Sequence, residues 1–304
     1  MKVIFRFDAS EALARKVTAL ATEGIEIACV PEAEDAPYER LLPDAEVIWH
    51  VLKPIDEKQI ALANNLKLIQ KIGSGVNTID VEAAKRRGIA VCNLPGTNSR
   101  AVAEMALLLM LACLRRLCDL DRFVRKAEWR TAWTLQDHFG ELGGRSVGLL
   151  GYGEVPKLLQ PMLEALGANV SFWSRSRKSA ELDAIVGSSD IVSLHLPLTP
   201  ETERMLDPRR MKRGAILINT ARGALVEESL LIDALKTGQL AAAGLDVFAQ
   251  EPPPAGHPLL ALPNVVCAPH LAWLTRETLQ RSIAVALENV RRLEAGEALL
   301  HRVA

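Results

Sequence analysis

The stretch that decides the fold is residues 146–166, S-V-G-L-L-G-Y-G-E-V-P-K-L-L-Q-P-M-L-E-A-L. Residues 147–151 suit a buried strand, and after a glycine turn the apolar residues recur at helical spacing. A dinucleotide requires this arrangement: Gly151 makes the turn, Gly153 lets the backbone approach the pyrophosphate, and N–H groups at the helix start bind phosphate. Pro156 stands where G-x-G-x-x-G has its third glycine, and it removes one N–H. Taken alone, the stretch fits either a dinucleotide site or an ordinary strand-to-helix turn.

Length and composition limit the classes of protein that remain. The 304 residues suffice for two domains, and a net charge of -1 is not that of a nucleic-acid-binding protein. The first eight residues, M-K-V-I-F-R-F-D, predict a strand and not a signal peptide, and no segment is long and apolar enough for a membrane span. The cysteines are scattered along the chain and include no C-x-x-C pair: Cys29, Cys92, Cys113, Cys118 and Cys267. This pattern predicts reduced thiols in a cytoplasmic protein and no metal site.

Segments typical of strands alternate with segments typical of helices over the first hundred residues. The strands are expected at residues 3–7, 25–30, 47–52, 66–72 and 89–92. The helices are expected at residues 12–22, 55–64 and 81–87. Such alternation predicts an α/β domain with a parallel, doubly wound sheet.

A second alternating series follows. Residues 101–114, apolar except for Glu104, predict a buried helix that either joins two domains or belongs to the core of one. Residues 119–142 contain Trp129 and Trp133 but no clear strand, and we expect them to form a covering segment. Further strands are expected at residues 147–150, 170–173, 191–194, 215–219, 243–246 and 265–267, with helices at 157–166, 225–236 and 276–294. The chain is therefore predicted to form two doubly wound domains, residues 1–98 plus 275–304 and residues 99–274.

Polar residues follow three of the strands in the second series. Arg222 follows residues 215–219, Glu251 follows residues 243–246 after a short loop, and His270 follows residues 265–267. Ligands of open α/β sheets bind at the carboxyl ends of the strands. Each residue alone also fits a structural role, as a surface cation, a loop acid or a capping residue. Together with a nucleotide turn, they predict a site for hydride transfer.

Long motifs along nearly the whole chain resemble those of the D-isomer-specific 2-hydroxyacid dehydrogenases. They are I-G-S-G-V-N-T-I-D (72–80), R-A-V-A-E (100–104), S-L-H-L-P-L-T-P-E-T (193–202), L-I-N-T-A-R-G-A-L-V-E-E (217–228), A-A-A-G-L-D-V-F-A-Q-E-P (241–252) and L-P-N-V-V-C-A-P-H-L-A (262–272). The resemblance implies a flavodoxin-like substrate domain built from both chain ends, a central Rossmann domain, and a homodimer formed by the nucleotide domains.

The resemblance also implies roles for individual residues. Arg222 would bind the substrate carboxylate and carbonyl oxygen, His270 would be the acid/base, and Glu251 would be its partner. A guanidinium fork suits a carboxylate, and a nearby carboxylate favours the imidazolium. The backbone amides of Ser74, Gly75 and Val76 would hold the other side of the carboxylate. From the residues alone, a simple β-turn is the alternative interpretation of this segment.

Cofactor contacts are implied at the glycine turn, at the end of the next strand and at later strand ends. These residues are Gly151, Tyr152, Gly153, Glu154, Val155, Ser174, Arg175, Ser176, His195, Leu196, Pro197, Thr202, Thr220, Ala221, Asp246, His270 and Ala272. An NAD site usually has Asp or Glu about 20 residues past the glycine turn. Here Ser174 takes that position and Arg175-Ser176-Arg177-Lys178 follow, which predicts NADP as the preferred cofactor with NAD still possible. A solvated basic loop is the alternative.

Departures from the family pattern bear on the substrate. Met105 stands where the family often has His, and Trp273 stands where a small residue is common. The Trp273 indole either narrows the substrate pocket, favouring a short oxo acid, or covers the domain hinge. Ser74 replaces the lysine of the phosphite-oxidising branch, which argues against that activity. We therefore predict a reductase of the glyoxylate/hydroxypyruvate type, with a dinucleotide-sensing corepressor-like protein or a dehydrogenase of larger or sugar-derived acids as alternatives.

Overall fold

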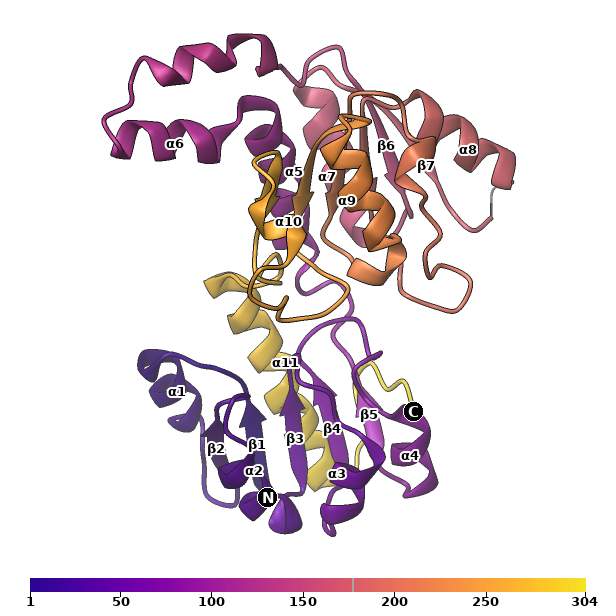
Figure 1. The fold of residues 1–304 in the computed structure, drawn as a ribbon. Helices are drawn as coiled ribbons and strands as arrows, with labels where there is room; N and C mark the ends of the chain where they lie inside the picture. Colours follow the sequence, from indigo (N-terminus) through magenta and orange to yellow (C-terminus); the bar gives the residue numbers. More distant parts are fainter. Residues whose placement is uncertain (177) are drawn as a thin grey trace. The chain divides into compact units, whose positions relative to one another are not determined.

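A computed structural model describes residues 1–176 and 178–304 of the protein (Figure 1). Arg177, which belongs to the predicted basic loop, lies outside the described residues. The chain forms two compact units, Met1–Asn98 with Thr275–Ala304, and Ser99–Leu274. Each unit contains a parallel sheet, so the predicted α/β class with two doubly wound sheets is confirmed.

The first unit has the strand order β2-β1-β3-β4-β5, the order of flavodoxin-like sheets. Its strands are β1 (Lys2–Arg6), β2 (Glu26–Val30), β3 (Val47–His50), β4 (Leu68–Lys71) and β5 (Ala90–Cys92). Its helices are α1 (Glu11–Thr18), α2 (Asp35–Leu41), η1 (Leu42–Asp44), α3 (Glu57–Leu62), α4 (Val81–Arg86) and α11 (Arg276–Ala295).

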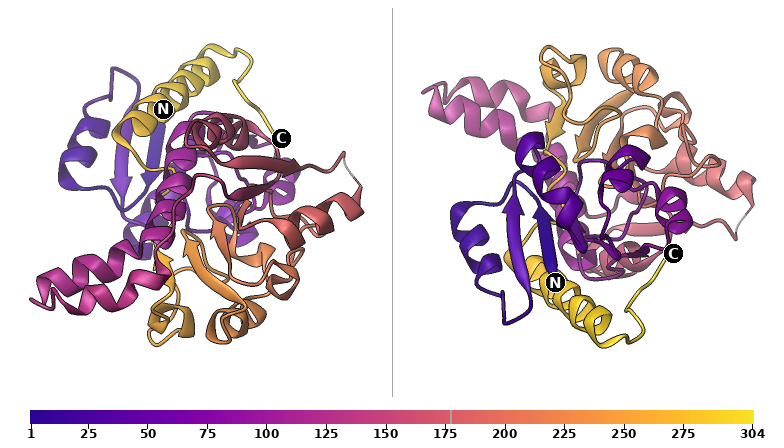
Figure 2. Two further views of the ribbon diagram at one scale, coloured as in Figure 1. Left: turned by 90° about the horizontal axis from the view of Figure 1, so that it is seen from above. Right: turned by 90° about the horizontal axis from the view of Figure 1, so that it is seen from below.

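Both faces of this sheet are buried, which is why apolar residues occupy most positions of its strands. Ile4, Ile48 and Ile69 pack on one face against α2, α3 and α4. The opposite face carries Gln70, whose side chain meets Asn289 of α11. Figure 2 shows α11 alongside the strands of this unit.

The second unit has the order β11-β10-β9-β8-β6-β7. Its strands are β6 (Ser146–Leu150), β7 (Asn169–Trp173), β8 (Ile191–Leu194), β9 (Ala215–Asn219), β10 (Leu240–Leu245) and β11 (Val265–Cys267). Its helices are α5 (Ser99–Arg115), α6 (Leu117–Arg125), η2 (Thr131–His138), α7 (Glu154–Ala165), α8 (Ser179–Ser188), η3 (Pro208–Arg210), η4 (Gly223–Leu225), α9 (Glu228–Lys236) and α10 (Pro258–Ala261). The strand order reverses between β6 and β8, where doubly wound sheets bind ligands.

The two faces of this sheet carry separate apolar cores. Ile216 and Ile218 face α5 and α7, whereas Leu217 between them faces α8 and α9. Helix α5 packs on β9, β10 and α7, as a core helix of the second unit does, and its first residue, Ser99, is also the first residue of that unit after Asn98.

Three predictions made from local pattern need correction. Helix α7 begins at Glu154 and not at the predicted residue 157. Pro156 is accommodated in the first turn, because N–H groups in the first turn of a helix make no hydrogen bond within the helix. Helices α2 and α8 were not predicted, since neither short segment has a clear apolar period. Strand β10 begins at Leu240 and not at the predicted residue 243. Its pairing with β9 shifts register between Leu240 and Ala242.

Residues 117–138 form an arm and not the predicted covering segment. Helix α6 and the 3-10 segment η2 contact each other and extend away from the sheet of their unit (Figure 1). Trp129 and Trp133 are 66% and 68% exposed. The prediction of a covering segment was wrong, because large apolar side chains here are not buried within the chain itself.

Candidate active site

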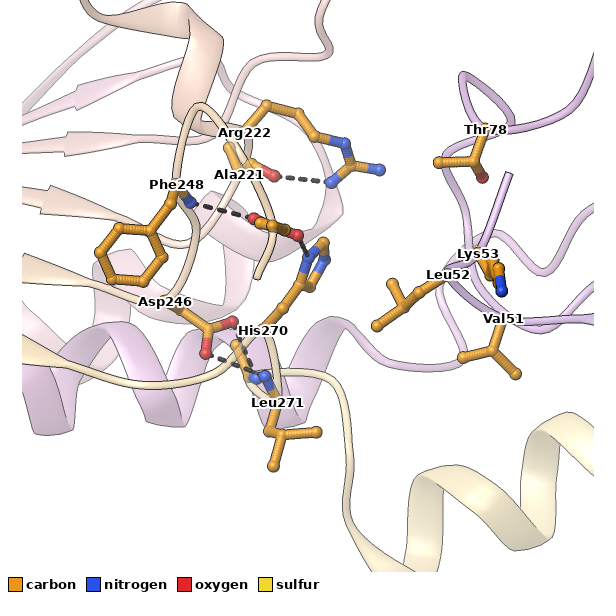
Figure 3. A network of polar contacts seen from close by, with 12 residues as sticks. Val51, Leu52, Lys53, Thr78, Ala221, Arg222, Asp246, Phe248, His270 and Leu271 are labelled. Atoms are coloured by element: carbon orange, nitrogen blue, oxygen red, sulfur yellow. Dashed lines mark hydrogen bonds and ion pairs between the residues drawn. The ribbon is translucent and has the colours of Figure 1, made fainter. Parts of the chain in front are cut away.

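Adjacent strands bring together the residues that we predicted for chemistry. Strands β9, β10 and β11 are neighbours in the sheet, and Arg222, Asp246 and His270 follow their carboxyl ends. The loop after β10 returns Glu251 to the same place. Figure 3 shows Arg222, Asp246, Phe248 and His270 gathered at this end of the sheet.

Glu251 and His270 are in direct polar contact. Glu251 Oε2 lies 2.5 Å from His270 Nδ1, and Glu251 Oε1 accepts a hydrogen bond of 2.9 Å from the N–H of Phe248. Burial acts to raise the pKa of Glu251, but His270, the Phe248 N–H and Arg222 together hold that pKa below its ordinary value. The side chain is therefore an anion directed at one nitrogen of the imidazole.

Asp246 holds the backbone that carries His270. Its carboxylate accepts hydrogen bonds of 2.9 Å from both the Leu271 N–H and the Ala272 N–H, and the His270 N–H donates to the Asp246 carbonyl at 2.7 Å. His270 itself has φ 57, a left-handed conformation that few residues other than glycine adopt. Asp246 is 1% exposed, and burial raises its pKa despite the two N–H donors. Both oxygens of this predicted cofactor contact thus serve the turn that bears His270.

The loop after β9 positions Arg222. Asn219 fastens this loop at two points, accepting from the Ala221 N–H at 3.0 Å and donating to the Arg222 carbonyl at 2.8 Å. Arg222 Nη1 donates to the Ala221 carbonyl at 2.6 Å. Burial lowers the pKa of Arg222, and Glu251 opposes this effect. The guanidinium remains charged because its ordinary pKa lies so far above neutrality.

Sequence reasoning missed the residues that hold the Glu251 loop. Glu228, in the first turn of α9, accepts from the Ala249 N–H at 3.2 Å through Oε2, and its Oε1 lies 3.0 Å from His257 Nε2. His257 Nδ1 accepts from the Leu259 N–H, so Nε2 carries the proton toward Glu228. The available signals were Glu228 at a helix start and His257 before Pro258, but neither indicates a contact with the other.

The glycine turn after β6 fits a dinucleotide. Gly151 has φ 99, and a Cβ there would lie 2.4 Å from the His195 carbonyl oxygen, so only glycine suits this position. A Cβ on Gly153 would meet nothing within 4 Å, which leaves open space beside the start of α7. Gly153 is the N-cap of that helix and provides no side-chain cap, so the first N–H groups of α7 are available to a phosphate.

The other predicted cofactor contacts surround the carboxyl ends of the same sheet. The Thr220 hydroxyl is buried and finds no hydrogen-bond partner among the described residues, as expected of a group that awaits a ligand. Ser174 Oγ lies 2.9 Å from Ser176 Oγ, and Arg175 beside them is exposed. Tyr152 stacks on Phe172 and donates to Gln160, and Thr202 donates to the Pro197 carbonyl at 2.7 Å. Burial lowers the pKa of His195 to about 4, so its ring is neutral.

In the first unit, Ser74, Gly75 and Val76 form a half-exposed turn after β4 and Gly73. Among the described residues, none of their N–H groups donates a hydrogen bond within the protein. Such a row of free amides is a suitable receptor for a carboxylate. Trp273, which we predicted near the substrate, is buried at 7% exposure, and Met105 is half-buried in α5.

Comparison with known proteins decides the family. The sequence model described as "D-isomer specific 2-hydroxyacid dehydrogenase, NAD binding domain" matches residues 107–272. The chain belongs to this family. A glyoxylate reductase of Aeropyrum pernix is 41% identical over 275 residues, covering 84% of this chain and 82% of that protein.

Solved members and neighbours of the D-isomer specific 2-hydroxyacid dehydrogenases share the fold over the full chain. A Thermus thermophilus protein has 35% identity and a TM-score of 0.89, with all of both chains covered. An NAD-dependent formate dehydrogenase of Staphylococcus aureus, solved in complex with NAD, has 26% identity and a TM-score of 0.89, covering 100% of this chain and 99% of that chain.

Family membership establishes an oxidoreductase that uses a nicotinamide dinucleotide and acts on a small 2-oxo or 2-hydroxy acid. Among the described residues, no group of three or more His, Cys, Asp or Glu side chains is arranged to hold a metal ion. None of the helices in that part of the chain combines the length and apolar character needed to span a bilayer.

Proposed function

We propose that this dehydrogenase reduces a short 2-oxo acid of the glyoxylate or hydroxypyruvate type to the D-2-hydroxy acid, with NADPH preferred to NADH. The contact of 2.5 Å between Glu251 Oε2 and His270 Nδ1 carries the proposal. It leaves Nε2 as the imidazole nitrogen that can donate a proton. Reduction of a carbonyl requires a proton donor of this kind beside a group that holds the substrate carboxylate.

Each residue of the site has a defined task in this reaction. The reduced nicotinamide, when bound, supplies the hydride that C2 of the oxo acid accepts. His270 donates its Nε2 proton to the oxygen of that carbonyl, and the negative charge of Glu251 stabilises the imidazolium before the transfer. Arg222 holds the carboxylate with charge-assisted hydrogen bonds, which orients the carbonyl carbon.

The turn of Ser74, Gly75 and Val76 is proposed as the carboxylate-binding element of the substrate domain. Its free amides support this assignment, since they have no acceptor among the described residues. The short substrate is supported by the similarity to the Aeropyrum pernix glyoxylate reductase. The proposed effect of Trp273 on pocket size stays a prediction.

The cofactor preference rests on the end of β7. Ser174 provides no carboxylate to repel a 2′-phosphate, and the exposed Arg175 follows it directly. A competing anion is close by: the pKa of Glu201 is lowered mainly by a hydrogen bond from Thr199, with a contribution from Arg175. A bound 2′-phosphate would therefore compete with Glu201 for the cation.

We also propose that the protein is a homodimer formed by the nucleotide domains and located in the cytoplasm. The arm of residues 117–138 supports the dimer, because Leu117, Val124, Trp129 and Trp133 are all at least half exposed. Large exposed apolar patches of this kind mark contact surfaces. Light scattering coupled to size exclusion should give twice the mass of 33.2 kDa.

A turnover screen tests the proposed function. Purified protein would be mixed with glyoxylate, hydroxypyruvate, pyruvate and a sugar-derived oxo acid, each with NADPH and with NADH. Oxidation of the cofactor should be fastest with the two-carbon or three-carbon acids. A dinucleotide sensor would bind the cofactor and oxidise it negligibly with every acid, and preference for the largest acid would point to the sugar-acid alternative.

A further inference from the structure

The proposed carboxylate-binding turn is held in shape by residues that follow a different strand. Leu94, just after β5, donates its N–H to the Gly73 carbonyl at 2.8 Å. Asn93 donates from Nδ2 to the Ser74 carbonyl at 2.8 Å. The Ser74 hydroxyl in turn donates to the Leu94 carbonyl at 3.2 Å. Three hydrogen bonds therefore connect the turn to Asn93 and Leu94.

These bonds determine where the free amides of the turn point. A peptide group is planar and trans, so its C=O and N–H point in opposite directions. When Leu94 holds the Gly73 carbonyl, it orients the N–H of Ser74, which belongs to the same peptide. When Asn93 holds the Ser74 carbonyl, it orients the N–H of Gly75. Asn93 and Leu94 thus present two adjacent N–H groups on the side away from themselves.

Asn93 is itself held by the C-terminal residues. Its N–H donates to the His301 carbonyl at 3.1 Å, and the Val303 N–H donates to the Val91 carbonyl at 2.7 Å. Cys92 and Arg302 form an antiparallel bridge between these segments. The last residues of the chain therefore extend the sheet beyond β5 and support the residue that reaches the turn.

A buried pair of amides anchors this support. Asn289 Nδ2 donates to Gln70 Oε1 at 2.6 Å and to the Leu300 carbonyl at 3.0 Å, while Asn289 Oδ1 accepts from the Leu300 N–H at 2.7 Å. Gln70 Nε2 lies 3.5 Å from the Asn93 carbonyl. Gln70 and Asn289 are both 0% exposed, where an unmade hydrogen bond is most costly. This satisfied network resists displacement of Asn93.

We propose that Asn93 is a positioning residue for substrate binding, which acts by orienting the Gly75 amide toward the substrate carboxylate. The inference rests on the proposed function, in which the turn binds that carboxylate. Asn93 need not touch the substrate. Its effect is expected on the affinity for the acid and not on hydride transfer or cofactor binding.

The test uses Asn93→Ala and Asn93→Asp, since aspartate keeps the size of the side chain but loses the Nδ2 donor. Both should raise KM for glyoxylate or hydroxypyruvate roughly five- to tenfold, the effect of one hydrogen bond of about 1 kcal/mol. The values of kcat and of KM for NADPH should stay within about twofold of the parent. The dissociation constant of oxamate, an unreactive 2-oxo-type carboxylate, should rise by the same factor as KM.

Asn65→Ala is the matched control, because Asn65 makes a comparable bond of 3.2 Å to the Pro43 carbonyl elsewhere in the same unit. It should change none of these constants. A further variant, Gly75→Pro, removes an N–H from the turn itself.

If Gly75→Pro raises KM but both Asn93 variants leave KM unchanged, the inference is overturned and the proposed function stands. If none of the three variants changes KM, the turn does not bind the carboxylate and that part of the proposed function fails as well. Parallel losses in kcat and cofactor affinity would mean a general structural role and would also overturn the inference.

Discussion

Glu251 Oε2 and His270 Nδ1 are 2.5 Å apart, although the two residues come from loops after different strands. The contact occupies one nitrogen of the imidazole with an anion whose pKa is held below its ordinary value. In the proposed reaction the other nitrogen, Nε2, would donate the proton to the substrate, and this role leads to the first prediction.

Replacing His270 by Asn should lower kcat by roughly 10²- to 10⁴-fold, the usual contribution of a positioned acid. The dissociation constant of NADPH, measured by fluorescence titration, should change little. Glu251→Gln removes the anion that contacts His270 Nδ1, so the kcat of this variant should fall as well. Near-normal turnover of His270→Asn would remove this residue from the mechanism.

Replacing Arg222 by Lys keeps the charge but loses the planar fork. KM for the oxo acid should rise and kcat should fall, with kcat/KM reduced roughly ten- to hundredfold for each charged hydrogen bond lost. Steady-state kinetics with the acid and with its neutral amide would measure this. Equal activity of the parent protein toward the acid and the amide would contradict the carboxylate clamp.

The cofactor loop predicts a roughly ten- to hundredfold preference for NADPH, the equivalent of one charge-assisted hydrogen bond to the 2′-phosphate. The double variant Ser174→Asp with Arg175→Ala should reverse it, because a carboxylate at position 174 would accept from the ribose hydroxyls of NADH. Both cofactors would be compared at one ionic strength with the same oxo acid. Equal kcat/KM for the two in the parent would show that this loop does not recognise the phosphate.

Glu228 should affect catalysis from outside the site. Glu228→Ala frees the Ala249 N–H and His257, so the loop that carries Glu251 loses one attachment. We expect kcat to fall roughly tenfold, since small displacements of catalytic groups have large effects on rate. Glu228→Gln keeps an acceptor for Ala249 and should restore part of the activity. Glu227→Ala, at the N-cap of the same helix, is the control. An equal loss of kcat in this variant would rule out a specific role for Glu228.

His195 should make the stability of the protein depend on pH. Burial lowers the pKa of His195 to about 4, whereas in the unfolded chain the histidine takes up a proton near its ordinary value of 6.5. The unfolded state therefore binds more protons between these values, and the contribution of His195 to stability is complete above pH 6.5 and is lost as the pH falls toward 4. Between pH 7 and pH 4.5 the parent should lose about 2 kcal/mol more in free energy of unfolding than His195→Gln. Denaturant titration at both pH values measures the difference, which should vanish if the ring is solvated.

The sequence by itself was sufficient for the fold class and for the position of Arg222 and His270 after strand ends. Strands buried on both faces are apolar at successive positions, and turns such as Gly151-Tyr152-Gly153 need glycine for local steric reasons. Each of these two signals, the apolar strand and the glycine turn, can be recognised within a segment of a few residues. The placement of Arg222 and His270 after strand ends follows from the same local pattern, because parallel strands end at one edge. The short helices α2 and α8 escaped prediction because their local pattern is weak.

Only the tertiary structure decided which partner each polar group takes. The resemblance implies a cofactor contact at Asp246, which stays a prediction, and only the structure shows that its two oxygens hold the N–H groups of Leu271 and Ala272. Nothing local connected Glu228 with His257, which are 29 residues apart, or Gln70 with Asn289, which are 219 residues apart. A hydrogen bond depends on distances of a few tenths of an ångström between groups that packing brings together from distant parts of the chain. Hydrophobic period and turn chemistry act over one element at a time, so they specify where a polar residue stands but not the atom toward which it points.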